Sequence, residues 1–197
     1  MTKVLLATNN PGKAAEIKSI LEGIGAILVT PAEIGLTMEV EEDGSSYGQN
    51  AAIKARAFCE ASGLITLADD SGLEVYALNG QPGIHSARFS PIPGATDADR
   101  RQYLLERLRE KPHPWRARFR CAIAIVAPGR PVTFTEGVCP GEVISEERGE
   151  NGFGYDPIFL LSEIGKTMAQ LSMEEKNRLS HRGRAVHAAI PILTAML

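Results

Sequence analysis

The chain has 197 residues, of which 44% are hydrophobic and 23% charged, the balance of an ordinary globular protein that can bury a substantial core. Its net charge of -3 argues against a broad basic surface that binds nucleic acid. No apolar run is long enough for a membrane span or a signal-peptide core, and three widely separated cysteines form no zinc-ligand cluster. We therefore expect a single cytoplasmic domain over residues 1–197, without a membrane or nucleic-acid partner.

The first predicted elements are a buried strand and a capped helix. Residues 4–7 form a short apolar run, typical of a strand buried on both faces. Asn10 followed by Pro11 predicts the start of a helix that ends near Gly23. The loop between them offers free backbone N–H groups, with Gly12 allowing close approach and Lys13 adding charge, which suits a phosphate. An ordinary capped helix is the alternative, because the loop lacks the first glycine of a Walker A motif.

Two adjacent acids follow the second predicted helix. Residues 47–61 are Ala-rich and favour a helix, which leads into an apolar strand expected to end at Asp69. Asp69 and Asp70 repel one another, and removing either from water is costly unless a cation or donor compensates. A site that handles metal or protons explains the pair, although two solvated acids or a helix cap would also fit.

The remaining elements predict an antiparallel section and two late helices. A short strand and turns are expected over residues 72–83, and Thr96 caps a helix to about Glu110 with Asp99 in a capping box. Alternating residues from Arg116 predict a strand, followed by separate strands over 132–135 and 138–144. A capping box over 172–175 begins a helix that breaks near 180–183 and resumes with a kink before Pro191. The order predicts an α/β protein with a mixed sheet flanked by helices, and two lobes with a ligand cleft between them.

Two later segments are candidates for ligand binding. In residues 149–157, three glycines flank two aromatic residues and an acid, so a planar ligand could stack there while a polar group reads its edge; a bulge with a packed aromatic is the alternative. His181 and Arg182 place two donors at the break between helices, where a solvated helix end is the simpler interpretation. Lys176 on its own reads as a surface lysine.

Together these segments resemble the inosine/xanthosine triphosphate pyrophosphatase family, which hydrolyses non-standard purine nucleoside triphosphates to the monophosphate and pyrophosphate. The resemblance runs nearly the whole length, through LLATNNPGK, NAAIKARAF, LADDSGLEVYALNGQPGIHSARFS, GENGFGYDPIF and EEKNRLSHRGRA in the family's order. It implies an elongated mixed sheet with two lobes, a homodimer, a Mg²⁺ requirement, and removal of ITP, dITP and XTP from the nucleotide pool.

The resemblance also implies a role for each matching residue. Asp70 would be the catalytic base or a magnesium ligand, supported by Asp69 and by one acid of the pair Glu41 and Glu42, with Glu42 preferred. The triphosphate would be held by Thr8, Asn9, Asn10, Pro11, Gly12 and Lys13, with Lys54 assisting and Ser71 touching substrate. The base would be held by Phe153, Gly154, Tyr155, Asp156, Lys176, His181 and Arg182, whose donors favour a 6-oxo purine.

Two positions depart from the family pattern. Many relatives carry Gly where Asn9 stands, which raises the question of a backbone conformation that Asn adopts less freely. Many carry Glu where Gln49 stands, which removes one acid near the expected metal. Two rival functions remain at this point: a pyrophosphatase for pyrimidine or modified triphosphates, and a nucleotide-binding sensor without turnover.

Overall fold

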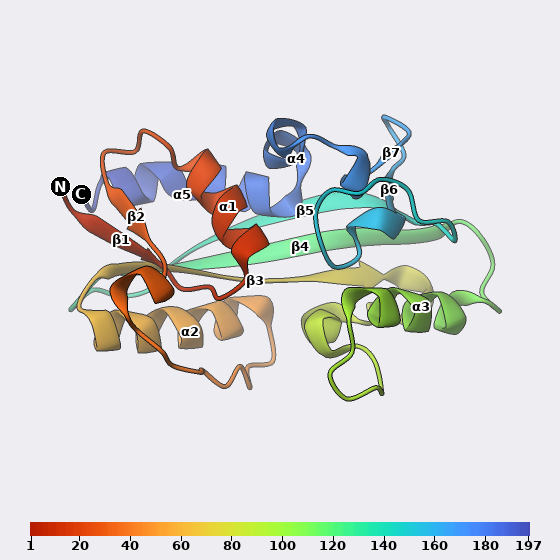
Figure 1. The fold of residues 1–197 in the computed structure, drawn as a ribbon, viewed down its shortest axis with the longest axis horizontal. Coiled ribbons are helices and arrows are strands. Elements are labelled where there is room, and N and C mark those ends of the chain that lie inside the picture. Colours follow the sequence, from red (N-terminus) through yellow and green to blue (C-terminus); the bar gives the residue numbers. More distant parts are fainter. The chain divides into compact units, whose positions relative to one another are not determined.

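The computed structural model describes residues 1–197 and arranges seven strands in one mixed sheet of order β2-β1-β3-β4-β5-β6-β7, flanked by helices (Figure 1). The strands are β1 Lys3–Leu6, β2 Ile27–Val29, β3 Ile65–Val75, β4 Trp115–Val126, β5 Thr133–Val143, β6 Phe159–Leu161 and β7 Lys166–Thr167. The α-helices are α1 Pro11–Ile20, α2 Tyr47–Ser62, α3 Asp97–Leu108, α4 Met173–Leu179 and α5 His181–Thr194. The predicted α/β class with a mixed sheet is confirmed.

The chain divides into two compact units, as the two-lobe prediction requires. Unit 1 comprises Met1–Asp70, Cys121–Gly137 and His181–Leu197, and unit 2 comprises Ser71–Arg120 and Val138–Ser180. Strand β1 pairs in parallel with β2 and with β3 in unit 1. Strands β5, β6 and β7 pair antiparallel through residues of unit 2. The parallel and antiparallel pairings thus follow the predicted change from helix-flanked strands to a meander.

Unit 1 buries both faces of its strands, which explains the unbroken apolar run at the N-terminus. Val4 and Leu6 face the helices α1 and α5, in a cluster with Ile17 and Ala185 among others. Leu5 faces the other way, toward the small residues of α2. Because side chains alternate along a strand, an apolar residue is needed at every position. Figure 1 shows α1 and α5 on one face of β1 and α2 on the opposite face.

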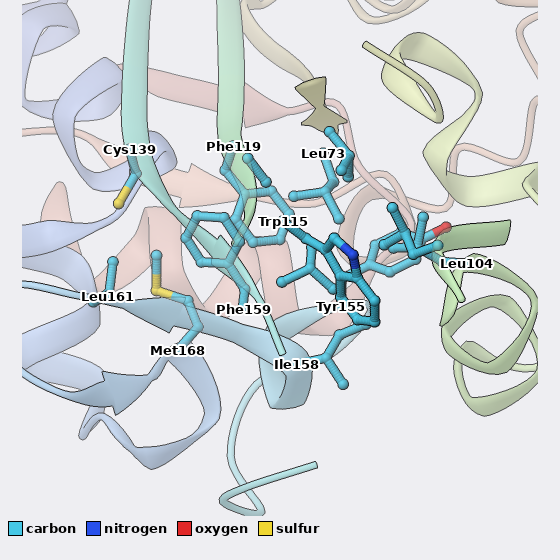
Figure 2. Packing of buried hydrophobic residues seen from close by; sticks show 14 of the residues in the cluster. Leu73, Leu104, Trp115, Phe119, Cys139, Tyr155, Ile158, Phe159, Leu161 and Met168 are labelled. Carbon is cyan, nitrogen blue, oxygen red and sulfur yellow. The ribbon is translucent and has the colours of Figure 1, made fainter. Parts of the chain in front are cut away.

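Unit 2 has a core of its own, which is rich in aromatic residues. Leu104 and Leu108 of α3 pack in one cluster with Trp115 at the start of β4 and with Tyr155 and Phe159 of the late segment (Figure 2). Helix α3 begins with the predicted capping box of Thr96 and Asp99. The helix ends at Leu108, two residues before the expected Glu110. The core therefore fixes α3 against the segment that contains the glycine-rich loop.

Two predicted strand boundaries are wrong. Strand β3 was expected to end at Asp69, but it continues through both acids to Val75, because partners from α1 and α2 satisfy the carboxylates without a turn into solvent. Residues 132–135 and 138–144 were expected to be separate strands, but β5 runs through Gly137. A Cβ atom at Gly137 would lie 2.0 Å from the His181 carbonyl oxygen, so this glycine serves close packing of α5 rather than a turn.

Two late helices are present as predicted, but the break between them is shorter than the expected 180–183, because residues 181–183 are already helical. Helix α4 begins with the capping box of Ser172 and Glu175, and the chain becomes extended at Ser180 before α5 starts. Helix α5 remains one helix through Pro191, and the kink expected before that residue stays a prediction. None of the helices combines the length and the hydropathy needed to cross a bilayer. All three cysteines are buried free thiols.

Candidate active site

The loop between β1 and α1 has the geometry of a helix N-terminus ready for an anion. The side-chain oxygen of Asn10 accepts a hydrogen bond from the Lys13 N–H at 3.0 Å, and Thr8 Oγ1 accepts one from the Asn10 N–H at 3.2 Å. Pro11 occupies the first turn, as predicted. Asn9 does not have a positive φ, so Asn in place of the relatives' Gly creates no strain here. The loop therefore keeps its predicted form despite this departure.

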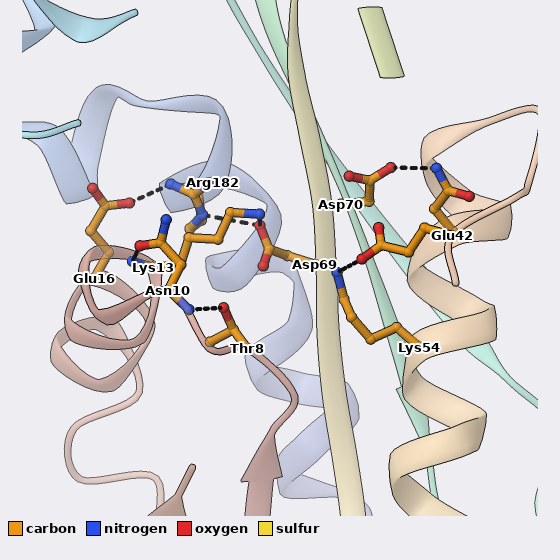
Figure 3. A network of polar contacts seen from close by, with 10 residues as sticks. Thr8, Asn10, Lys13, Glu16, Glu42, Lys54, Asp69, Asp70 and Arg182 are labelled. Atoms are coloured by element: carbon orange, nitrogen blue, oxygen red, sulfur yellow. Dashed lines mark hydrogen bonds and ion pairs between the residues drawn. The ribbon is translucent and has the colours of Figure 1, made fainter. Parts of the chain in front are cut away.

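Asp69 lies in a buried cluster of charges on the α1 and α5 face of β3 (Figure 3). Its Oδ2 atom is 2.9 Å from Lys13 Nζ and 3.3 Å from Arg182 Nε. Arg182 Nη1 also pairs with Glu16 Oε2 at 2.5 Å, and the side chains of Arg182 and Glu16 are only 2% and 3% exposed. Burial alone would raise the pKa of Asp69, but the charges of Lys13, Arg182 and Lys54 outweigh burial and hold that pKa well below its usual range. Asp69 is thus a compensated, permanently ionised group.

Asp70 points to the opposite face of β3, toward α2 (Figure 3). Its Oδ2 atom accepts a hydrogen bond of 3.0 Å from Asn50 Nδ2, which favours the ionised form. Burial has the larger effect and, together with the negative charge of Glu42, raises the pKa of Asp70. Two neighbours in the sequence therefore have opposite electrostatic environments.

Lys54 supplies positive charge on the Asp70 side. Its ammonium group is 2.9 Å from Glu42 Oε1. Burial would lower the pKa of Lys54, but Asp69, Glu42 and Asp70 together raise it, so the lysine remains protonated. The structure thus brings together in unit 1 the predicted Lys13, Glu42, Lys54, Asp69 and Asp70. Glu41 is exposed, which keeps Glu42 as the preferred acid of that pair.

The residues on this side suit a magnesium ion that is shared with a substrate. No cluster of three or more His, Cys, Asp or Glu side chains forms a ready metal cage. Asp70 nevertheless has a carboxylate whose ionisation is disfavoured by burial and by Glu42, a situation that a cation would relieve. Mg²⁺ usually binds through one or two carboxylates together with substrate phosphates and water. The donor set of Asp70 and Glu42 fits that mode.

The glycine-rich loop of unit 2 holds one aromatic side chain inside and one at the surface. Tyr155 is buried, and its hydroxyl donates to the Ser86 carbonyl oxygen at 2.9 Å. Phe153 is half-buried, and Lys176 Nζ lies 4.7 Å from its ring centroid. The same ammonium pairs with Asp156 Oδ2 at 2.6 Å. Lys176 is only 4% exposed, so the interpretation of a surface lysine is wrong. The alternative of a packed aromatic therefore describes Tyr155, whereas Phe153 offers a half-buried ring for stacking, with the buried Lys176 ammonium beside it.

Asp156 also organises the backbone of this loop. Its Oδ2 atom accepts the Phe153 N–H at 2.9 Å. A Cβ atom at Gly152, where φ is +77°, would lie 2.1 Å from that same oxygen. Only glycine fits there, which is a physical reason for the glycine-rich sequence.

The predicted substrate contacts of three residues are not tested by the structure. Ser71 begins unit 2 on β3, and His181 is buried at the start of α5 in unit 1. The guanidinium of Arg182 binds the carboxylates of Asp69 and Glu16. Contact of His181 and Arg182 with a nucleobase, and of Ser71 with substrate, therefore stays a prediction.

Sequence reasoning missed two buried polar residues that complete the site. Asn50 lies one helical turn before Lys54, and Glu16 lies three residues after Lys13. Such spacings put each pair on one face of its helix, which was the available signal. Gln49, the second departure from the family pattern, accepts hydrogen bonds from Ser45 at 2.7 and 2.9 Å and is exposed. Asn50, and not Gln49, is the residue at this end of α2 that contacts Asp70.

Comparison with known proteins gives one consistent result. The sequence profile of the Ham1 family matches residues 4–192. A dITP/XTP pyrophosphatase from Desulfotalea psychrophila is 48% identical over 93% of this chain and 81% of its own length, and one from Thermus thermophilus is 47% identical over 95% and 90%. The structure of a HAM1 protein from Coxiella burnetii, at 39% identity, matches with a TM-score of 0.89 over 99% of this chain and 100% of that one. The chain thus belongs to the Ham1 family.

Proposed function

We propose that this protein hydrolyses the non-standard purine nucleoside triphosphates ITP, dITP and XTP to their monophosphates and pyrophosphate, in a Mg²⁺-dependent reaction. The observation that carries the proposal is the pair of acids on β3, one compensated by buried cations and one with a raised pKa beside Glu42 and Lys54. The family and the relatives named dITP/XTP pyrophosphatase support the substrate class.

The loop of residues 8–13 would bind the triphosphate. The positive end of the α1 helix dipole and the charge of Lys13 would attract phosphate oxygens. Lys54 adds a second cation near Asp70. Both lysines already have carboxylate partners, so substrate would share or replace those contacts. The phosphate chain is thereby bound by groups that are ordered before it arrives.

Asp70 would act on the attacking water. A carboxylate with a raised pKa accepts a proton more readily than an ordinary aspartate, and the Asn50 hydrogen bond fixes its orientation. If Asp70 instead acts as a magnesium ligand together with Glu42, the ion would supply charge neutralisation for phosphate oxygens. Asp69 would keep Lys13 and Arg182 in place. We infer attack on the α-phosphorus, with pyrophosphate as the leaving group stabilised by Lys13 and Lys54.

Base selection would begin at the face formed by Phe153 and Lys176. The ring offers stacking, which every purine accepts, and the ammonium is a donor that suits the 6-oxo group of hypoxanthine or xanthine. Adenine presents a donor at that position, so a site built around donors disfavours ATP. A cytoplasmic location and a homodimer, both implied by the family resemblance, belong to the proposal as predictions.

The direct test is pyrophosphate release from ITP, XTP, dITP, ATP, GTP and UTP, measured in parallel with Mg²⁺ and with a chelator. We expect strong release from the first three, dependent on Mg²⁺. Similar rates on all six would retain the hydrolase and contradict the base selection. Tight ITP binding without release would instead support the sensor.

The bond that is cleaved can be read from the products. Hydrolysis of ITP in ¹⁸O-labelled water should place the label in the monophosphate, because water attacks the α-phosphorus. Label in pyrophosphate would show attack at the β-phosphorus and would contradict the proposed orientation of Asp70 and the phosphate loop.

A further inference from the structure

Helix α3 binds the Gly154 peptide groups from both sides. Asp97 Oδ2 accepts the Gly154 N–H at 2.8 Å, and Arg101 Nη1 donates to the Gly154 carbonyl oxygen at 2.9 Å. Asp97 and Arg101 are four residues apart, so they lie on one face of α3. The N–H and the carbonyl of Gly154 belong to the two peptide planes on either side of its Cα. Fixing both therefore fixes the backbone of Gly154, whose φ is +62°.

The two α3 side chains are themselves held firmly. Arg101 makes a two-pronged ion pair with Glu147, at 2.7 and 2.9 Å. Asp97 pairs with Arg100 through its other oxygen. Burial would raise the pKa of Asp97, but the hydrogen bonds from Arg100 and the Gly154 N–H lower it, so the carboxylate is an acceptor at neutral pH. Each contact with the Gly154 backbone therefore has an ionised partner, the stronger class of hydrogen bond.

The loop is also held by hydrogen bonds of Asn151, two residues before Phe153. The Asn151 N–H donates to the Ala169 carbonyl oxygen and its side-chain amide to the Leu171 carbonyl oxygen, both at 3.0 Å. Phe153 lies between these attachments and the Gly154 contacts, with its ring beside the Lys176 ammonium. The orientation of the Phe153 ring thus depends on a backbone that α3 fixes immediately after it.

We propose that Asp97 and Arg101 are positioning residues for nucleobase recognition, which set the orientation of Phe153 through the Gly154 backbone. This inference rests on the proposed function. A stacking face that is ordered before substrate arrives does not lose conformational entropy on binding, and small displacements of a recognition group weaken discrimination. The phosphate-binding and water-activating residues of unit 1 make none of these contacts, so the effect should fall on substrate binding rather than on turnover.

The test compares Asp97→Ala, Asp97→Asn and Arg101→Ala with Arg107→Ala as a control. Arg107 lies on the same helix, but its guanidinium contacts the Tyr103 hydroxyl and ring. We expect Asp97→Ala and Arg101→Ala to raise the KM for ITP by roughly 10-fold, to keep kcat within about 3-fold, and to lower the preference for ITP over ATP. Asp97→Asn keeps an oxygen that can accept the Gly154 N–H, so it should restore most of the wild-type KM.

Hydrogen exchange provides a readout that needs no substrate. Amides of residues 149–158 should exchange faster in Asp97→Ala and Arg101→Ala than in the wild type or Arg107→Ala. Unchanged KM, preference and exchange in both variants would overturn the inference, as would an Asp97→Asn variant as impaired as Asp97→Ala. If Asp97→Ala does not fold, Arg101→Ala alone tests the inference. A wild type that fails to hydrolyse ITP or XTP would overturn the proposed function. Faster exchange of residues 149–158 in the variants would in that case still show that Asp97 and Arg101 hold the Gly154 backbone.

Discussion

Asp69 and Asp70 are neighbouring buried acids on one strand, yet their pKa values are shifted in opposite directions. Asp69 faces α1 and α5, where Lys13 and Arg182 hold its pKa far below the usual range. Asp70 faces α2, where burial and Glu42 raise its pKa. Strand geometry produces this difference, because successive side chains point to opposite faces of a sheet.

The difference shows how one short motif can supply two functions. A carboxylate fully compensated by buried cations has little tendency to take a proton or a metal, so Asp69 serves to hold Lys13 and Arg182 in place. A carboxylate whose ionisation is still disfavoured by burial is ready for a cation or a proton, which is the property required of Asp70. The comparison can be tested by altering the partners on each face.

The largest expected effect is the loss of stability when Arg182 is replaced by Met. The change leaves Asp69 and Glu16 buried without their shared guanidinium, and breaking a buried ion pair in this way typically costs ~3–5 kcal/mol. Denaturant unfolding measures this loss. Lys18→Met is the matched control, because it removes an exposed ion pair with Glu33 and should change the unfolding free energy little. Equal losses in the two variants would contradict a structural role for the Asp69 cluster.

The next effect is on substrate binding through Lys13. Replacing Lys13 by Met removes the cation at the start of α1, and charged hydrogen bonds of this kind contribute ~1.5–3 kcal/mol, so kcat/KM for ITP should fall by roughly 10- to 100-fold. Steady-state kinetics should place most of the loss in KM. A variant with unchanged KM would show that Lys13 serves only as the partner of Asp69.

A smaller effect concerns the pH dependence set by Asn50. The amide hydrogen bond lowers the pKa of Asp70, so its loss in Asn50→Ala should raise that pKa further. Because the base must be ionised, the acid limb of the pH profile of kcat should move to higher pH. Gln49→Ala, which alters only a contact with Ser45, should leave the limb in place. An unmoved limb in Asn50→Ala would mean that Asp70 does not set it.

The sequence predicted the elements around the site better than the contacts inside it. Caps at Asn10, Thr96 and Ser172 are local signals, and all three begin helices as expected. The continuation of β3 through two acids could not be predicted locally, because their partners are 20 residues away in α2 and 113 residues away in α5. The continuation of β5 through Gly137 could not be predicted either, because the close approach of α5 to this glycine is a tertiary feature.

In the candidate site, too, the contacts between distant residues could not be predicted from the sequence. The residues around Asp70 and the loop at Phe153 were identified from the sequence, but the buried partners Asn50 and Glu16 were not. Arg182 was expected to contact a base, and its location between two carboxylates became visible only in the fold. A motif thus identified the chemical groups, while burial and packing determined how each is charged.

The pKa directions give opposite stability predictions for the two acids. Asp69 has a lowered pKa when folded, so it contributes stability above its unfolded pKa that is lost as pH falls through the folded value. Asp70 has a raised pKa, so its ionisation costs stability as pH rises through the folded value. The contribution of Asp69 is therefore present in full at neutral pH, whereas ionisation of Asp70 without metal works against folding.

The most direct test measures ITP turnover and unfolding free energy for Asp69→Asn and Asp70→Asn, with unfolding followed in chelator at neutral pH. We predict that Asp70→Asn loses at least ~100-fold in turnover while its stability equals or exceeds that of the wild type, and that Asp69→Asn is clearly destabilised. Near-normal turnover in Asp70→Asn, or equal destabilisation of the two variants, would contradict the division of roles between these neighbouring acids.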